Sequence, residues 1–243
     1  MRNTELIKNI YEEKKVSSKK LSTQLLYGEN FTILKSYTKW LKIKCQYDNY
    51  IGYILNKNYA SSVLNTHKVN KLKVTLYKNP KKFKKTKKKI SFCSLIKVTS
   101  KKNNFYKFDN YWIRIADVNP INKKMNIFSN IKIFTDVKYK WGGLSFKGID
   151  CSALVQVFYK YNNKYCPRDS INQLKFFKGV NKKFKKYDLI FWKGHVAICI
   201  NKNQLIHAYG PKKKVIIMNI NKTINEIKHS SNLNVQSIVN ESN

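Results

Sequence analysis

A glycine-rich turn that runs directly into a cysteine constrains the fold of this 243-residue chain more than any other feature. Residues 139–152 read YKWGGLSFKGIDCS, and the stretch that follows lacks Pro and Gly and has apolar side chains at helical spacing. This pattern predicts a helix over residues 151–161 with Asp150 as its N-cap. Cys151 then opens the helix, where backbone N–H groups and the helix dipole favour a thiolate and predict a lowered thiol pKa. The apolar positions are Leu154, Val155, Phe158 and Tyr161.

Three strands are predicted after this helix, because β-branched and aromatic residues are concentrated in three short runs. A helix that presents a nucleophile to an antiparallel sheet makes this part of the chain α+β. The runs cover residues 188–192, 195–200 and 204–209.

The turn between the last two strands decides where two histidines lie. If the hairpin is symmetric about Lys202, His195 and His207 fall on one face as diagonal neighbours, about 7–8 Å apart between backbones. Two imidazoles can meet across that gap, whereas a slip of one residue sends one ring to the other face. The sequence Asn-Lys-Asn at residues 201–203 favours the turn.

A cysteine nucleophile needs a base to take its proton and a third group to orient that base. Of the four histidines, His67 lies in a predicted connection and His229 in the polar C-terminal part, which leaves His195 and His207. Taken singly, a cysteine that opens a helix is usually a small buried residue and a histidine in a strand is usually structural. The combination favours catalysis. Cys45, Cys93 and Cys199 lie in predicted strands and are interpreted as structural, and Cys166 has no assigned role.

The formal net charge of +36 invites a nucleic-acid interpretation. Only three of the 49 basic residues are arginine, the residue whose planar fork reads phosphates and bases best. Richness in Lys, Asn, Ile, Tyr and Phe is explained more simply by an AT-rich genome. We therefore expect no specific nucleic-acid partner, although the positive field would attract acidic substrates.

The cysteine pattern and the N-terminal sequence predict the compartment. The five cysteines include no CxxC pair, so neither a disulfide framework nor a metal site is expected, and no cofactor is called for. No apolar signal-peptide core and no membrane-span length occur, which predicts a cytoplasmic protein, or a periplasmic or extracellular one if the start is misassigned.

The N-terminal half favours short strands at residues 31–35, 40–45, 50–55, 72–77, 90–98, 105–108 and 111–116. Asp-Asn-Tyr precedes a strand twice, at residues 48–50 and 109–111, which indicates two copies of a small antiparallel barrel. The lysine run at residues 79–89 is expected to be a solvated loop. The predicted division is a polar segment at 1–20 with a short helix near 5–14, barrels at 21–70 and 71–118, a linker at 119–130, and the α+β domain at 131–243.

Six motifs in the last domain resemble the series found in NlpC-type (NlpC/P60) cell-wall cysteine peptidases, which are papain-like. The segment before the domain is similar to the bacterial SH3-like domains that precede such peptidases, so the resemblance implies two SH3-like barrels followed by a peptidase. The motifs are YKWGG (139–143), GIDCS (148–152), PRDSINQ (167–173), DLIFW (188–192), GHVAIC (194–199) and IHA (206–208).

The resemblance implies roles for individual residues. Cys151 is the nucleophile, His195 the base and His207 the orienting residue. Tyr139 lines the site, while Asp150, Ser152 and Ser170 hold the peptide on the acyl side. Glu29, in the first barrel, approaches a free peptide amine. Two departures occur: the family's usual glycines are replaced by Ala153 and Tyr187, and the second puts the local turn in doubt.

The implied activity is hydrolysis of murein peptides at the bond between γ-D-glutamate and a diamino acid. Three alternatives stay open at this stage. One is an exported wall hydrolase or other amidase of the same family. The second is a binding module whose barrels dock on a wall fragment or a protein. The third is a nucleic-acid binder driven by the lysines.

Overall fold

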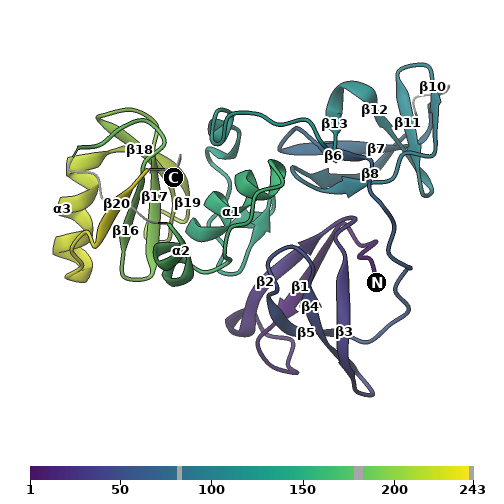
Figure 1. Cartoon of the computed structure of the whole chain (residues 1–243), viewed down its shortest axis with the longest axis horizontal. Coiled ribbons are helices and arrows are strands. Elements are labelled where there is room, and N and C mark those ends of the chain that lie inside the picture. Colours follow the sequence, from purple (N-terminus) through teal and green to yellow (C-terminus); the bar gives the residue numbers. More distant parts are fainter. Residues whose placement is uncertain (81–83, 178–182, 241–243) are drawn as a thin grey trace. The chain divides into compact units, whose positions relative to one another are not determined.

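The computed structural model describes residues 1–80, 84–177 and 183–240. The chain divides into two compact units, Met1–Lys124 with Leu144–Phe146, and Met125–Gly143 with Lys147–Asn243. The first is built of strands, and the second combines helices with a sheet, as the predicted α+β class requires (Figure 1). No helix in the described ranges has the length and apolarity to cross a membrane.

The first unit begins with a five-stranded antiparallel sheet in the order β2-β1-β5-β4-β3. Strand β4 shows why these residues form strands: its buried side chains alternate with half-buried ones, as the two-residue period of a strand requires. The buried side chains of all five strands pack into one core. The elements are β1 (Ile7–Tyr11), the 3-10 turn η1 (Ser18–Lys20), β2 (Leu21–Leu26), β3 (Phe31–Ser36), β4 (Trp40–Cys45) and β5 (Ile51–Leu55).

The short helix predicted near residues 5–14 is wrong, because this segment contains strand β1. Ile10 is fully buried in the core of the sheet, and β1 pairs with β2 from Ile7 to Tyr11. Pairing with a segment further along the chain overrides the local helical preference. The segment predicted to precede the first barrel therefore supplies one of its strands.

The first unit contains two further sheets. One has the order β10-β11-β12-β7-β8, and a smaller one has the order β13-β6-β9. A core of buried residues from both sheets joins them. The strands are β6 (His67–Val69), β7 (Lys73–Asn79), β8 (Lys84–Ser91), β9 (Leu95–Ile96), β10 (Ser100–Lys102), β11 (Phe105–Phe108), β12 (Tyr111–Arg114) and β13 (Val118–Pro120), with the 3-10 turn η2 (Ile115–Asp117).

Two predictions for this region are wrong. The chain does not run as one strand over residues 90–98, because it turns at Cys93, whose φ is 67°, between β8 and β9. The lysine run at 79–89 is not a loop throughout, because β8 begins at Lys84 and pairs with β7; residues 81–83 lie outside the described residues. The lysine run lacks the alternation of apolar and polar residues that indicates a strand, so the sequence pattern does not reveal β8.

Tyr27 and Gly28 join the two barrels of the first unit. Tyr27 is buried in the core of the second barrel, where its ring lies edge-on to Phe108 at 5.6 Å and its hydroxyl donates to Asp109. Gly28 has φ +82°, and a Cβ there would lie 1.9 Å from the carbonyl oxygen of Leu95. Only glycine permits this approach.

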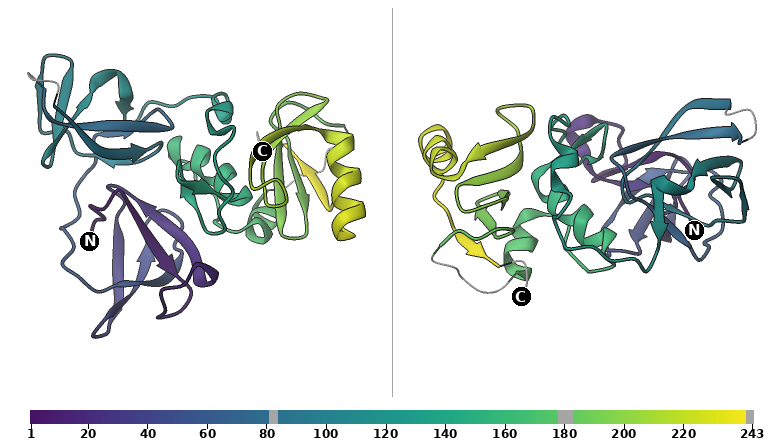
Figure 2. Two further views of the ribbon diagram at one scale, coloured as in Figure 1. Left: turned by 180° about the vertical axis from the view of Figure 1, so that it is seen from behind. Right: turned by 90° about the horizontal axis from the view of Figure 1, so that it is seen from above.

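The second unit contains a five-stranded antiparallel sheet in the order β19-β18-β17-β16-β20. Helix α3 lies along this sheet (Figure 2). Apolar side chains of α3 and of these strands form a common core. The predicted helix at 151–161 and strand at 204–209 have the predicted bounds, and the strands at 188–192 and 195–200 agree within one residue. The elements are η3 (Ile131–Phe134), β15 (Gly148–Ile149), α1 (Cys151–Tyr161), α2 (Ser170–Phe176), β16 (Leu189–Trp192), β17 (His195–Cys199), β18 (Gln204–Tyr209), β19 (Lys214–Asn219), α3 (Ile220–Ser231) and β20 (Ser237–Val239). Strand β14 (Leu144–Ser145) belongs to the first unit.

Candidate active site

Cys151 is the first residue of α1, as predicted. The carboxylate of Asp150 accepts a hydrogen bond from the backbone N–H of Ala153 at 2.9 Å, which is the expected N-cap interaction. The Cys151 side chain is buried, and the backbone N–H groups of Ser152 and Val196 act on its sulfur in the direction that lowers the thiol pKa. Val196 follows His195 on β17, so the thiol lies beside the strand that carries the predicted base.

The predicted lowering of the Cys151 pKa is wrong. Burial, with a further contribution from the charge of Asp150, raises the pKa of this thiol to about 12. The two backbone N–H groups and the Arg168 guanidinium act in the opposite direction, but they do not outweigh desolvation. The resting side chain is therefore a neutral thiol, and it needs a base to become a nucleophile.

His195 and His207 meet, as the hairpin symmetry predicts. Ile198 pairs with Ile206 and Cys199 with Leu205, which centres the hairpin on Lys202. Nε2 of His195 lies 2.9 Å from Nδ1 of His207. One ring must donate to the other, because two nitrogens at this separation share a proton.

Both imidazoles are held in the neutral form. Burial lowers the pKa of His195 to about 4, and burial together with the neighbouring His195 lowers the pKa of His207 well below its usual value. The His207 ring also stacks on Tyr209, with ring centres 4.5 Å apart and an angle of 13° between the planes. At neutral pH this pair can accept a proton from a neighbouring acid.

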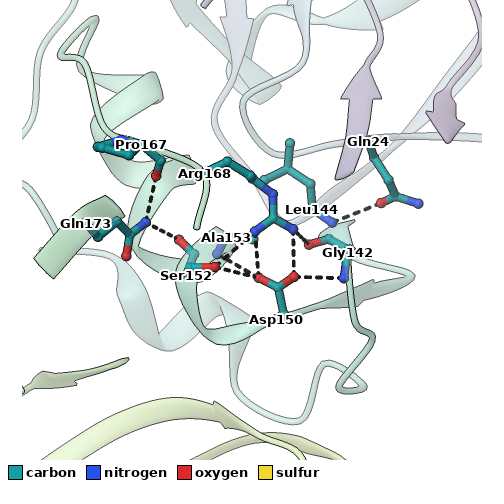
Figure 3. Close-up of polar contacts among 10 residues, drawn as sticks. Gln24, Gly142, Leu144, Asp150, Ser152, Ala153, Pro167, Arg168 and Gln173 are labelled. Carbon is teal, nitrogen blue, oxygen red and sulfur yellow. Dashed lines mark hydrogen bonds and ion pairs between the residues drawn. The ribbon is translucent and has the colours of Figure 1, made fainter. Parts of the chain in front are cut away.

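A buried ion pair holds the start of α1 (Figure 3). Arg168 donates from Nη2 to one oxygen of Asp150 at 2.6 Å and from Nη1 to the other at 3.0 Å, and both side chains are buried. The same carboxylate accepts hydrogen bonds from the backbone N–H of Gly142 and the hydroxyl of Ser152. Asp150 and Ser152, predicted to hold the peptide, are thus engaged with neighbouring protein groups.

Gln173 ties α2 to α1. Its Nε2 donates to the carbonyl oxygens of Ser152 and Pro167, both at 2.9 Å (Figure 3). The same nitrogen contacts the sulfur of buried Cys166 at 3.5 Å. Sequence reasoning assigned no role to Arg168 or Gln173. The available signal was their place in PRDSINQ, where Arg168 is one of three arginines in the chain.

The other predicted site residues have different surroundings. Burial and the nearby Cys151 raise the pKa of Tyr139, so the phenol is neutral and lies within electrostatic reach of the thiol. Ser170 begins α2 and is half-buried, and the hydrogen bonds of the Asp150 network described above do not include it. Glu29 belongs to the first unit, where its carboxylate accepts from the backbone N–H of Leu26 at 2.5 Å. The predicted role of each in binding a peptide stays a prediction.

The turn at Tyr187 is retained in spite of the missing glycine. Tyr187 has φ 74°, a left-handed conformation that glycine adopts without strain. Its backbone N–H donates to the carbonyl oxygen of Cys199 at 2.7 Å, which fixes the approach to β16. Tyr187 therefore adopts the backbone conformation of the missing glycine, which is strained for a residue with a side chain.

None of the five cysteines, all of which lie in the described ranges, forms a disulfide bond, and all five are buried. Within residues 1–80, 84–177 and 183–240, no group of three or more His, Cys, Asp or Glu side chains is arranged to hold a metal ion.

Two parts of the chain match the models of known protein families. Residues 136–231 match the model of the NlpC/P60 family, and residues 14–58 match the bacterial dipeptidyl-peptidase Sh3 domain. A gamma-D-glutamyl-L-lysine dipeptidyl-peptidase of Bacillus subtilis is 29% identical over 56% of this chain and 52% of its own length. The protein of the same name from Bacillus cereus is 26% identical over 84% of this chain and 72% of its own length.

A crystal structure of an NlpC/P60 family protein from Bacillus cereus has the same fold. The TM-score is 0.77 at 22% identity, and the match covers 90% of this chain and 94% of that one. The chain spans only about half the length of the Bacillus subtilis relative. The predicted combination of an SH3-like region with a papain-like domain is confirmed.

Proposed function

Because residues 136–231 belong to the NlpC/P60 family and residues 14–58 to a bacterial SH3 domain family, we propose that this protein is a cysteine peptidase. Its substrate is a short murein peptide, cleaved between γ-D-glutamate and the diamino acid. The observation that carries the proposal is the hydrogen-bonded His195–His207 pair, carried by the strand whose Val196 backbone N–H acts on the Cys151 thiol at the start of α1.

The reaction begins with a proton transfer. His195 takes the proton of the Cys151 thiol as the sulfur attacks the γ-carbonyl carbon of D-glutamate, and the carbonyl electron pair moves to oxygen. The backbone N–H of Cys151 stabilises this oxyanion, an interaction that is worth about 3–4 kcal/mol in other enzymes. Proton transfer in step with attack suits a thiol whose pKa is raised and an imidazole that is neutral.

The second half of the reaction restores the enzyme. The C–N bond breaks, and the imidazolium of His195 gives its proton to the leaving amine of the diamino acid. A water molecule then attacks the thioester with His195 as base, which releases the D-glutamyl carboxylate and returns the thiol.

Two observations support the choice of substrate. The two Bacillus relatives are named for the γ-D-glutamyl-L-lysine bond. The chain also has a formal net charge of +36, which attracts peptides that carry several carboxylates.

Mass spectrometry of L-Ala-γ-D-Glu-diamino acid tripeptides tests the proposal. The purified protein is incubated with the L-lysine and meso-diaminopimelate forms, beside the Cys151→Ala variant and a Cys45→Ala control, since Cys45 is a buried cysteine of the first unit. We expect free diamino acid and L-Ala-D-Glu from the wild type and the control but not from Cys151→Ala. Equal cleavage by Cys151→Ala, or no cleavage by the wild type, contradicts the proposal.

A further inference from the structure

The outer nitrogen of His207 faces a thioether. While Nδ1 of His207 lies 2.9 Å from His195, its Nε2 lies 3.3 Å from Sδ of Met218. Met218 is on β19, where His207 pairs with Ile216, so Met218 is the diagonal neighbour on the same face of the sheet. Neither the sequence motifs nor the proposed mechanism gives Met218 a role.

We propose that Met218 is a positioning residue, whose thioether selects the tautomer of the His195–His207 pair in which His195 can accept the thiol proton. The transfer of the thiol proton to His195 rests on the proposed function, whereas the choice of tautomer does not depend on it.

Two proton arrangements are possible for a neutral pair. In the first, Nε2–H of His195 donates to Nδ1 of His207, so the proton of His207 is on its own Nε2. In the second, Nδ1–H of His207 donates to Nε2 of His195, so the proton of His195 is on its Nδ1. Burial keeps both rings neutral near pH 7, so these two arrangements are the ones that compete.

Met218 discriminates between them because a thioether accepts hydrogen bonds and cannot donate them. In the first arrangement, Nε2–H of His207 points at Sδ and makes a weak N–H···S interaction. In the second, a nitrogen lone pair faces a sulfur lone pair at 3.3 Å. The half-buried Met218 packs against the core of the second unit, which keeps the sulfur in place.

Only the first arrangement suits a base at His195. Its Nε2 is engaged by His207, so Nδ1 is the nitrogen left to take a proton from Cys151. In the first arrangement that Nδ1 has a free lone pair, whereas in the second it already carries a proton. Met218 therefore acts through His207 on the protonation state of His195.

Imidazole ¹⁵N NMR of the full chain tests this inference without substrate. The chain has only four histidines, so the ring nitrogens of histidine-labelled protein can be assigned. Spectra of the wild type near pH 7 are compared with those of Met218→Leu, which keeps the bulk and removes the acceptor. The matched control is Ile216→Leu, a half-buried neighbour that packs against the same core, and His229 on α3 reports that the second unit is folded.

We expect the Nε2–H form of His207 in the wild type and the control, and a new population of the Nδ1–H form in Met218→Leu. Loss of one weak hydrogen bond should lower kcat/KM by about three- to tenfold in that variant. A wild-type His207 protonated at Nδ1, or identical tautomers in Met218→Leu and wild type, overturns the inference. If the expected tautomers are seen but the wild type cleaves no peptide, the proposed function fails and the tautomer assignment stands.

Discussion

Two polar pairs of the second unit treat charge in opposite ways. Asp150 and Arg168 form a charged pair joined by two hydrogen bonds, whereas His195 and His207 are joined by one and are both neutral. Burial disfavours charge in both places. The difference lies in how many partners each pair has.

The Asp150 carboxylate accepts hydrogen bonds from two backbone N–H groups, one hydroxyl and the two arms of a guanidinium. Those donors compensate the charge of the carboxylate. They hold the Asp150–Arg168 pair in one position, and the pair in turn holds the start of α1. The two histidines contact one another, the rings of Trp192 and Tyr209, and a thioether. Burial keeps both imidazoles neutral, and a neutral imidazole can take up a proton. The comparison predicts that the first pair supports stability and the second supports chemistry.

The largest expected effect is on turnover. Replacement of His195 by Gln keeps a polar group beside His207 but removes the base, so kcat should fall about 10²–10⁴-fold. The free energy of unfolding should change by about 1 kcal/mol or less. Steady-state kinetics and urea unfolding measure the two quantities, with His229→Gln on α3 as the control. A fall in kcat of less than about tenfold would remove the distinction between the pairs.

For Arg168→Met we expect the main effect on stability and not on turnover, because this change leaves the buried Asp150 carboxylate without its cation. The free energy of unfolding should fall by about 3–5 kcal/mol, measured by urea unfolding at neutral pH. The double variant Arg168→Met with Asp150→Asn should recover part of this loss, because no unpaired charge is left. A single variant as stable as the wild type would show that the ion pair does not hold α1.

Acid should destabilise the protein through the histidine pair. Between about pH 4 and pH 6.5, His195 is neutral in the folded state but protonated in the unfolded state, so the unfolded state binds more protons. This contribution is fully present above pH 6.5 and is lost as the pH falls towards 4, and it amounts to about 3 kcal/mol. Urea midpoints at about pH 7 and pH 4.5 should differ less in His195→Gln than in the wild type. Equal differences in the two proteins would contradict the lowered pKa of His195.

The smallest effect is expected at an exposed ion pair of the same length. Lys214 Nζ lies 2.6 Å from Asp136, as close as Arg168 to Asp150, but both side chains are exposed. Lys214→Ala should therefore change the free energy of unfolding by less than about 1 kcal/mol. Urea unfolding beside Arg168→Met makes the comparison direct. A loss as large as that of Arg168→Met would mean that burial is not what separates the two ion pairs.

Most of the geometry of the candidate site could be predicted from the sequence because it depends on short-range patterns. The apolar spacing after Asp150 gives the bounds of α1, and the hairpin centred on Lys202 brings His195 and His207 together. The strand β1 and the turn at Cys93 could not be predicted in this way. Both follow from pairing between segments far apart in the chain, and the residues concerned have no distinctive local pattern.

The sequence by itself determined where Cys151 lies on its helix and which two histidines meet. These properties follow from periodicity, capping and hairpin symmetry, which act within about a dozen residues. Only the tertiary structure decided that the Cys151 thiol is neutral, that Arg168 pairs with Asp150 and that Met218 faces His207. Desolvation and side-chain pairing depend on what packs against a residue from elsewhere in the chain, and no local pattern encodes that.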